Sequence, residues 1–207
     1  MSAESAAPRT GLLLAMMEPP AAMEEEFQDW YDTEHFPERA GTEGFATAQR
    51  LICLEGWPRY LALYDLSSLA VLDGPGYAAI ARNRYSRWTQ RIIPRVWGHY
   101  RAEAEQLHPG NALLGASGVP SRVALWRFRN ASATSDEAII VGARASFAHT
   151  PGLLQLRIFR ARATDTCDYL VTAELAGAVP MPPPDATAFG AALGHLDLAN
   201  LYMPYWR

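Results

Sequence analysis

The chain contains no lysine: all 18 of its basic residues are arginine. Schiff-base chemistry and catalysis by a lysine side chain are therefore excluded, because both need a side-chain amine. Acidic residues outnumber the arginines and give a formal net charge of -4. Such a chain has no general attraction for nucleic acid or for an anionic membrane surface. The composition instead favours a small organic molecule as the partner.

Cysteine is also scarce. Cys53 and Cys167 are the only two cysteines in 207 residues, and they form no CxxC pair. This spacing argues against a structural zinc site and against a disulfide scaffold. We expect a reducing, cytoplasmic setting.

Long apolar runs are missing as well. No run approaches the roughly 18 apolar residues that a membrane-spanning helix needs, so we expect no membrane insertion. The apolar segment 11–17 is short, and Glu4 and Arg9 precede it without a small-residue cleavage site after it. We interpret this segment as a buried strand and residues 1–9 as a loose tail.

Several catalytic motifs are absent. The sequence has no phosphate-binding glycine loop, no GxSxG elbow and no CxxCH motif. Nucleotide hydrolysis, ordinary serine esterase chemistry and covalent heme attachment are therefore not favoured. With 49% hydrophobic residues, the chain can form one large domain or two small ones, each with a core.

What the sequence does contain is an internal repeat. Residues 44–66 and 152–175 each contain, in order, a glycine, a predicted strand with an arginine, a turn and a second predicted strand. This second strand begins with Tyr-Leu and ends with an acidic residue followed by leucine. The landmarks 11 and 121, 44 and 152, and 60 and 169 are 110, 108 and 109 residues apart. We match Tyr60 with Tyr169, and Arg50 with Arg157.

Each repeat has the order β-α-β-β-α-β, which is the ferredoxin-like order of the α+β class. An antiparallel sheet of this kind carries two helices on one face, so two sheets can face each other as an α+β barrel. We predict a tail over 1–9, a first half over 10–102, a linker over 103–120 that is rich in Gly, Ala, Ser and Pro, and a second half over 121–207. One chain would then be an internal pseudo-dimer, present as a monomer or paired again as a homodimer.

The string WYDTEHFPER at 30–39, then a glycine, an arginine-bearing strand and PRYLALYDL at 58–66, resembles the EthD-like branch of the dimeric α+β barrel superfamily. The resemblance covers the first half and implies the scaffold. The superfamily includes polyketide cyclases, lactone isomerases, cofactor-free monooxygenases, heme enzymes, aldoxime dehydratases and proteins without an assigned role. It therefore implies a small-molecule site without selecting a reaction.

The WYDTEH segment is our candidate site. We predict a helix from about Ala21 that Pro37 ends, with Phe27 and Trp30 on its buried face. Tyr31 and His35 are four residues apart, so their side chains lie on the same side of the helix and can form one wall of a pocket. The helix dipole favours a charged histidine at this end, so His35 could be charged or neutral near pH 7.

In the functional interpretation, His35 is the general acid or base and Tyr31 donates a hydrogen bond to an oxygen that gains charge. Asp32 flanks the histidine as a third catalytic candidate. In the alternative interpretation, His35 caps the helix and pairs with Glu34 or Glu38 in solvent. The matching segment 135–150 lacks the Trp-Tyr-Asp cluster, which favours a site in the first half.

Further side chains complete the candidate pocket. An arginine stripe at 87, 91 and 95 either is a solvated helix face or brings Arg91 and Trp88 to the pocket mouth. Tyr60 and Tyr64 share one face of a strand and either line the barrel interior or pack against the helices. The substrate-binding candidates are Trp30, Glu34, Arg50, Tyr60, Tyr64, Trp88 and Arg91.

No metal site is expected, because the remaining histidines show no ligand spacing. We expect no cofactor, although a noncovalent heme is compatible with one axial histidine. The leading hypothesis is a cofactor-independent enzyme that performs isomerisation, elimination or cyclisation on a hydrophobic or aromatic carbonyl metabolite. The alternatives are a non-catalytic or stress-associated binding protein, and a monooxygenase or heme enzyme.

Overall fold

The computed structural model describes residues 9–81, 84–162 and 166–206. Within these ranges, eight strands close into a barrel in the order β1-β3-β2-β8-β5-β7-β6-β4. Each neighbouring pair of strands is antiparallel. The strands are Gly11–Glu18 (β1), Phe45–Glu55 (β2), Tyr60–Leu66 (β3), Trp97–His108 (β4), Arg122–Ser132 (β5), Leu153–Ala161 (β6), Thr166–Leu175 (β7) and Leu196–Pro204 (β8).

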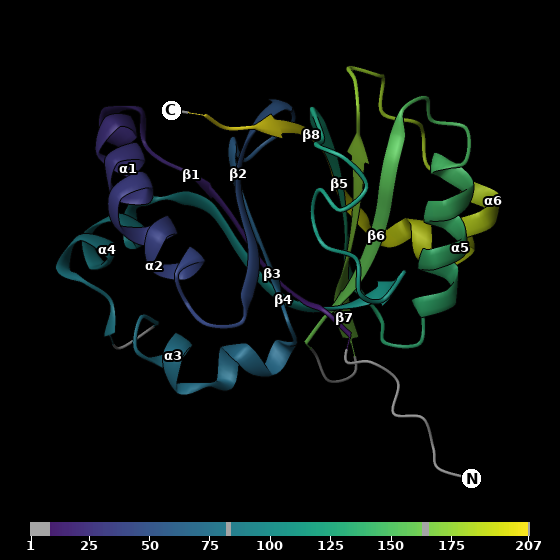
Figure 1. Ribbon diagram of the computed structural model, residues 1–207. Helices are drawn as coiled ribbons and strands as arrows, with labels where there is room; N and C mark the ends of the chain where they lie inside the picture. The colour runs from purple at the N-terminus through teal and green to yellow at the C-terminus, as the bar shows by residue number, and fades with distance from the viewer. Residues whose placement is uncertain (1–8, 82–83, 163–165, 207) are drawn as a thin grey trace, which may run out of the picture.

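The helices cover the outside of the barrel, those of the two halves on opposite sides (Figure 1). In the first half they are Ala21–Met23 (η1), Glu24–Trp30 (α1), Tyr31–His35 (η2), Phe36–Ala40 (α2), Leu69–Asp73 (η3), Pro75–Ala78 (α3), Arg87–Ile92 (α4) and Ile93–Arg95 (η5). In the second half they are Asp136–Phe147 (α5), Ala186–Phe189 (α6) and Gly190–His195 (η6). No helix among the described residues is long and apolar enough to cross a membrane.

The strand order confirms the predicted duplication. The first half contributes β4-β1-β3-β2 and the second contributes β8-β5-β7-β6, which is the same order with four added to each number. The two sheets join where β2 pairs with β8 and where β4 pairs with β6. The fold is therefore the predicted α+β barrel of tandem ferredoxin-like repeats.

The barrel interior is packed with side chains. Along β1, Leu12, Leu14 and Met16 belong to the interior cluster, whereas Leu13 and Met17 belong to the cluster under the first-half helices. This alternation follows from the two-residue period of a strand. Tyr60 and Tyr64 lie in the helix-facing cluster, so they pack against helices rather than line the barrel interior. Space for a ligand must therefore be sought between helices and sheet.

The strand registers test the matches between the repeats. Tyr60 lies opposite Met17, and Tyr169 lies opposite Phe128 at the equivalent place. Each tyrosine hydroxyl also donates a hydrogen bond to an acidic residue in the first turn of the α-helix that follows the first strand of its half, namely Glu24 in α1 or Asp136 in α5. The register therefore confirms the match between Tyr60 and Tyr169.

The match between Arg50 and Arg157 was wrong. Arg50 lies opposite Ala62, whereas Arg157 lies opposite Thr172. The residue equivalent to Arg50 is Ile158, which lies opposite Val171. A slip of one residue turns a strand side chain to the other face of the sheet, so the two arginines project to opposite sides of the barrel wall.

The predicted linker starts too early. Residues 103–108 form the end of β4, because Ala104 and Gln106 continue the alternation of buried side chains. The connection between β4 and β5 is tied to the barrel by two backbone amides: Leu114 donates to Asp65 at 2.6 Å and Gly115 donates to Glu174 at 2.8 Å. Residues 1–8 of the predicted tail lie outside the described part of the chain.

Candidate functional site

A π-helical turn carries the WYDTEH segment. Tyr31–His35 continues α1, and the Phe36 amide donates to the carbonyl of Tyr31, five residues back. After this wider turn, α2 begins with its own set of backbone hydrogen bonds, and Pro37 lies in its first turn. Backbone N–H groups in the first turn of a helix have no partner within the helix, so the N–H that proline lacks is not missed there. The prediction that Pro37 ends the helix was therefore wrong. Single π-helical turns inside α-helices are frequent at functional sites.

Between this segment and the sheet lies a cavity of about 30 Å³. A space of this size can hold water, and it is about a tenth of the roughly 300 Å³ at the lower end of ligand pockets. It lies over the helix-facing side of β1, next to Ala15. Its polar lining consists of Tyr31, His35, Arg39, Tyr64, Tyr77, Tyr85, His99 and Arg101.

Small side chains explain why the cavity lies in this half. Ala15 on β1 lies opposite Ala62 on β3. At the equivalent place in the second half, Trp126 on β5 lies opposite Val171 on β7, and Phe147 packs on Trp126 with ring centroids 4.7 Å apart. The second half therefore fills the space that the first half leaves open.

His35 is buried, with 4% of its surface exposed. Its ring packs on Trp30 with centroids 4.1 Å apart, and its Nδ1 has no hydrogen-bond partner among the described residues. Burial, and then the charges of Arg39, His99 and Arg50, hold the pKa of His35 well below its usual value. The histidine is therefore neutral near pH 7. It is neither the helix-end cation nor the solvent-exposed partner of Glu34 or Glu38 that the sequence suggested.

Tyr31 and Tyr64 line the same cavity as His35, together with Tyr77 and Tyr85. Tyr31 and Tyr64 are both buried, and burial raises the pKa of each, so both hydroxyls keep their protons. Their side chains hydrogen-bond each other, whereas His35 Nδ1 has no hydrogen-bond partner within the described ranges. The cavity therefore has a neutral, unpaired imidazole nitrogen and a pair of buried, protonated hydroxyls.

Asp32 and Arg50 lie beside this cavity rather than in its wall. Arg50 is buried, pairs with Asp32, and donates a hydrogen bond to Gln28. Its guanidinium carbon lies 4.3 Å from the centre of the Tyr31 ring and 4.4 Å from that of Tyr205. Arg50 and Asp32 therefore hold Tyr31 in place from outside the cavity, and a direct catalytic role for Asp32 has no geometric support.

The other sequence candidates have structural partners. Trp30 donates from Nε1 to the Thr89 hydroxyl at 2.9 Å, and that hydroxyl donates to Glu34 at 3.2 Å, which ties α4 to the WYDTEH segment. Trp88 packs partly buried against the same core. Arg91 is 62% exposed and pairs with Glu26 at 3.0 Å, as expected for a solvated helix face. The Tyr60 hydroxyl is bound by Glu24, as described above.

Sequence reasoning missed the strand residues of the cavity. His99 and Arg101 are two residues apart on β4, and alternation along the strand points both toward the cavity. Arg39 is buried and donates to the carbonyl of His35 at 3.0 Å. Among the described residues, arginines line the cavity and carboxylates do not, so the cavity favours a ligand oxygen that carries negative charge.

The cavity does not fit a heme. A porphyrin, like any ligand of several rings, is larger than this cavity of about 30 Å³. The corresponding layer of the second half is filled by Trp126, Phe147 and Phe189. Within the described ranges, no cluster of three or more His, Cys, Asp or Glu residues could hold a metal ion.

No protein-family model matches the chain, and comparison with curated proteins gives no match. Among solved structures, the chain is similar to an anthrone oxidase-like protein at 14% identity, with a TM-score of 0.64, over 100% of this chain and 94% of that one. It is also similar to a mutant chlorite dismutase from Candidatus Nitrospira defluvii at 8% identity, with a TM-score of 0.55, over 95% of this chain and 92% of that one.

At these identities, the similarity establishes the fold alone. These neighbours are ferredoxin-like α+β barrel proteins, as the strand order of this chain indicates. The narrower assignment to the EthD-like branch stays a prediction.

Proposed function

We propose that the protein is an enzyme that works without a cofactor and moves a proton on a hydrophobic or aromatic carbonyl metabolite, with His35 as the base. One observation carries the proposal: within the described residues, His35 Nδ1 is buried and unpaired at a cavity that the protonated hydroxyls of Tyr31 and Tyr64 also line. Proton removal next to a carbonyl needs a base and a hydrogen-bond donor at the developing oxyanion.

The proposed step conserves all atoms. A C–H bond conjugated with the substrate carbonyl breaks, either at the neighbouring carbon or, as in anthrone, across the ring through the aromatic system. Its proton passes to His35, and the electron pair forms an enolate whose oxygen accepts a hydrogen bond from Tyr64 or Tyr31. Return of the proton to another carbon gives isomerisation. Departure of a neighbouring leaving group gives elimination, and attack on a second carbonyl gives cyclisation.

The electrostatics of the cavity favour this step. Burial and the surrounding positive charges keep His35 neutral, and therefore ready to accept a proton at pH 7. The same charges disfavour the imidazolium until a negative oxygen forms beside it. Catalysis requires that the pair of imidazolium and enolate be stabilised more strongly than the neutral starting state, and Arg39 and Arg101 in the cavity wall would supply that stabilisation to the enolate oxygen.

A second candidate is a cofactor-free oxygenase that begins with the same proton transfer. The enolate would react with O₂ in place of a proton, and the net reaction would convert a CH₂ group and O₂ into a C=O group and water. The fold likeness to an anthrone oxidase-like protein supports this candidate. A non-catalytic binding protein is the alternative to both.

Anthrone, a flat tricyclic ketone with an acidic CH₂ group, tests the proposal. Exchange of its CH₂ protons in deuterated buffer without oxygen is followed by NMR, and oxygen uptake is measured separately. We expect His35→Gln to slow the enzyme-dependent exchange by about 100-fold, in the usual range for general base catalysis. Exposed His149→Gln is the matched control and should exchange at the wild-type rate.

The outcomes separate the candidates. Exchange that depends on His35 supports the proton-transfer enzyme, and oxygen uptake that also depends on His35 selects the oxygenase. Anthrone binding without exchange identifies a binding protein. Equal exchange in wild type and His35→Gln, with both proteins folded by circular dichroism, overturns the role of His35.

A further inference from the structure

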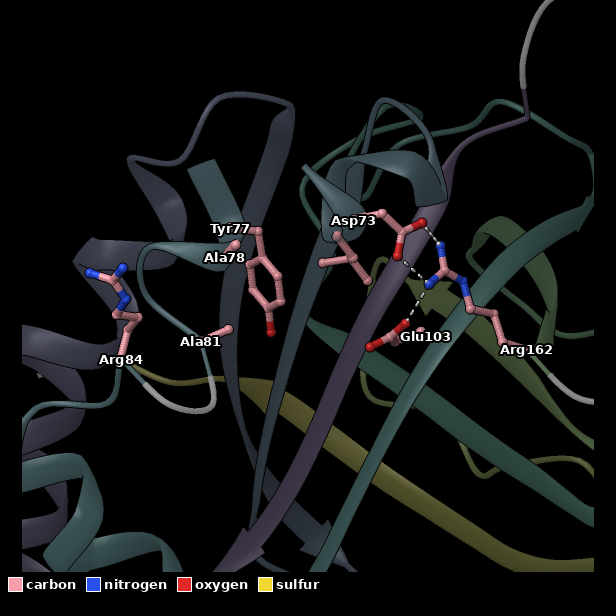
Figure 2. A pocket seen from close by; sticks show the side chains of 8 residues that line it. Asp73, Tyr77, Ala78, Ala81, Arg84, Glu103 and Arg162 are labelled. Carbon is pink, nitrogen blue, oxygen red and sulfur yellow. Dashed lines mark hydrogen bonds and ion pairs between the residues drawn. The ribbon is translucent and has the colours of Figure 1, made fainter. Parts of the chain in front are cut away.

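The cavity at His35 adjoins a much larger pocket. This pocket has a volume of about 430 Å³ and lies between α3, the middle of β4 and the residue that follows β6 (Figure 2). Ligand sites in proteins typically measure about 300–1,000 Å³. The larger pocket therefore has room for an organic molecule that the cavity at His35 does not provide.

Tyr77 separates the two spaces. Its side chain lines both the cavity and the larger pocket, and Figure 2 shows the ring pointing in from α3. The Tyr77 hydroxyl accepts a hydrogen bond from Arg101 at 2.9 Å, and Arg101 also pairs with Glu103 at 2.6 Å. Arg101 belongs to the cavity and Glu103 to the larger pocket, so this short chain of polar contacts is the wall between them.

The larger pocket has an apolar side and a charged side. Leu72, Ala78 and Ala81 line it together with the Tyr77 ring, which suits a flat hydrophobic group. On the charged side, Arg162 pairs with Asp73 at 2.7 Å and with Glu103 at 2.9 Å. Arg101 also pairs with Glu103, so two arginines balance two carboxylates here and leave little net charge to bind a ligand.

Arg84 differs from Arg162. Its side chain lines the pocket and is exposed, and it forms no ion pair or hydrogen bond with the residues that the structure describes. Figure 2 shows Arg84 on the side of Tyr77 opposite the Asp73, Glu103 and Arg162 cluster. A guanidinium at this place can pair with a carboxylate or a phenolate.

We propose that the larger pocket binds the body of a flat aromatic substrate that carries an anionic group, with its ring on Tyr77 and its anion on Arg84. For the carbonyl end of this substrate to reach His35, the Tyr77 side chain would have to shift and lose its hydrogen bond from Arg101. The inference rests on the proposed function for the reaction at His35, while the binding it describes can be measured alone.

The probes are 1-hydroxy-2-naphthoate, a fluorescent aromatic anion, and 1-naphthol, its neutral counterpart near pH 7. Ala78→Trp places an indole in the pocket and should weaken both probes by about tenfold or more. Ala79→Trp, at the next exposed position and outside the pocket lining, should bind both probes as the wild type does. Arg84→Gln should weaken only the anion, by roughly fivefold, as for an exposed ion pair.

If Ala78→Trp binds both probes as tightly as the wild type, the proposed pocket is wrong. If Arg84→Gln weakens the binding of both probes equally, the proposed anion site is wrong. Anthrone exchange tells a failure of this inference from a failure of the proposed function. If His35→Gln abolishes the exchange and Ala78→Trp leaves it unchanged, the proposed function stands and the pocket proposal is wrong. If the probes bind in the expected pattern but the wild type catalyses no exchange, the pocket proposal stands and the proposed function is wrong.

Discussion

Arg50 and Arg157 project from opposite sides of the barrel wall, although both come from the second strand of a repeat. Arg50 lies under the first-half helices and pairs with Asp32. Arg157 lies inside the barrel, fully buried, and pairs with Asp65 at 2.7 Å and with Glu174 at 3.0 Å. A single guanidinium therefore pairs with the equivalent acids of both halves.

Replacing Arg157 by Met should destabilise the protein severely. It would leave two buried carboxylates without a cation, and breaking a buried ion pair from one side typically costs about 3–5 kcal/mol. The free energy of unfolding, measured by urea denaturation, tests this expectation. Arg162→Met is the matched control: its partners Asp73 and Glu103 are in solvent contact, so a loss of about 1 kcal/mol or less is expected. Equal losses would contradict a special role for the interior cluster.

Filling the cavity should separate activity from stability. Ala15→Val adds carbon atoms where the structure has open space, so the free energy of unfolding should change by about 1 kcal/mol or less. Anthrone exchange should fall because the substrate carbonyl loses its place beside His35.

The control for this substitution is Ala173→Val on β7. Ala173 is buried in the filled layer of the second half, where an added side chain forces neighbours apart and costs about 1–3 kcal/mol. Urea denaturation of both variants checks the contrast. An Ala15 variant that is as destabilised as the Ala173 variant would show that the space at Ala15 is not available to a side chain.

Stability should fall as the pH drops below about 6.5, the usual pKa of histidine in an unfolded chain. Folded His35 resists protonation because it is buried and faces Arg39 on α2, Arg50 on β2 and His99 on β4. The unfolded chain then binds more protons than the folded one, so its stability relative to the folded state rises with acidity. Melting temperatures of wild type and His35→Gln between pH 5 and pH 8 test this point.

His35→Gln should flatten the pH dependence, whereas exposed His149→Gln should leave the wild-type slope unchanged. His99 also has a pKa lowered by burial, so part of the slope should remain in His35→Gln. Parallel curves for wild type and His35→Gln would show that His35 takes up its proton in the folded protein as readily as in the unfolded one.

The sequence was sufficient for the fold because the repeat and the strand periods are local patterns. The glycine-strand-turn-strand order, found twice, predicted two ferredoxin-like halves and the equivalence of Tyr60 and Tyr169. The same order gave a wrong match between Arg50 and Arg157. A shift of one residue moves a side chain to the other face of its strand, but it hardly changes the spacing between matched positions of the two repeats. Only hydrogen-bonded pairing fixes that register.

The candidate site was only partly predictable. Tyr31 and His35 come from one helical turn, and their proximity follows from spacing along the chain. His99 and Arg101 reach the same cavity from β4, more than 60 positions later in the sequence, because β4 pairs with β1. The π-helical turn was not visible either, since it depends on which carbonyl the Phe36 amide binds.

The contrast between Ala15–Ala62 and Trp126–Val171 shows what the fusion of two halves makes possible. In a barrel built from two identical chains, every substitution occurs twice, so a cavity opened in one half must also weaken the other. A single chain removes this constraint. One half can lose packing around His35 while the other retains a dense aromatic layer, and the shared barrel wall lets the second half support the first.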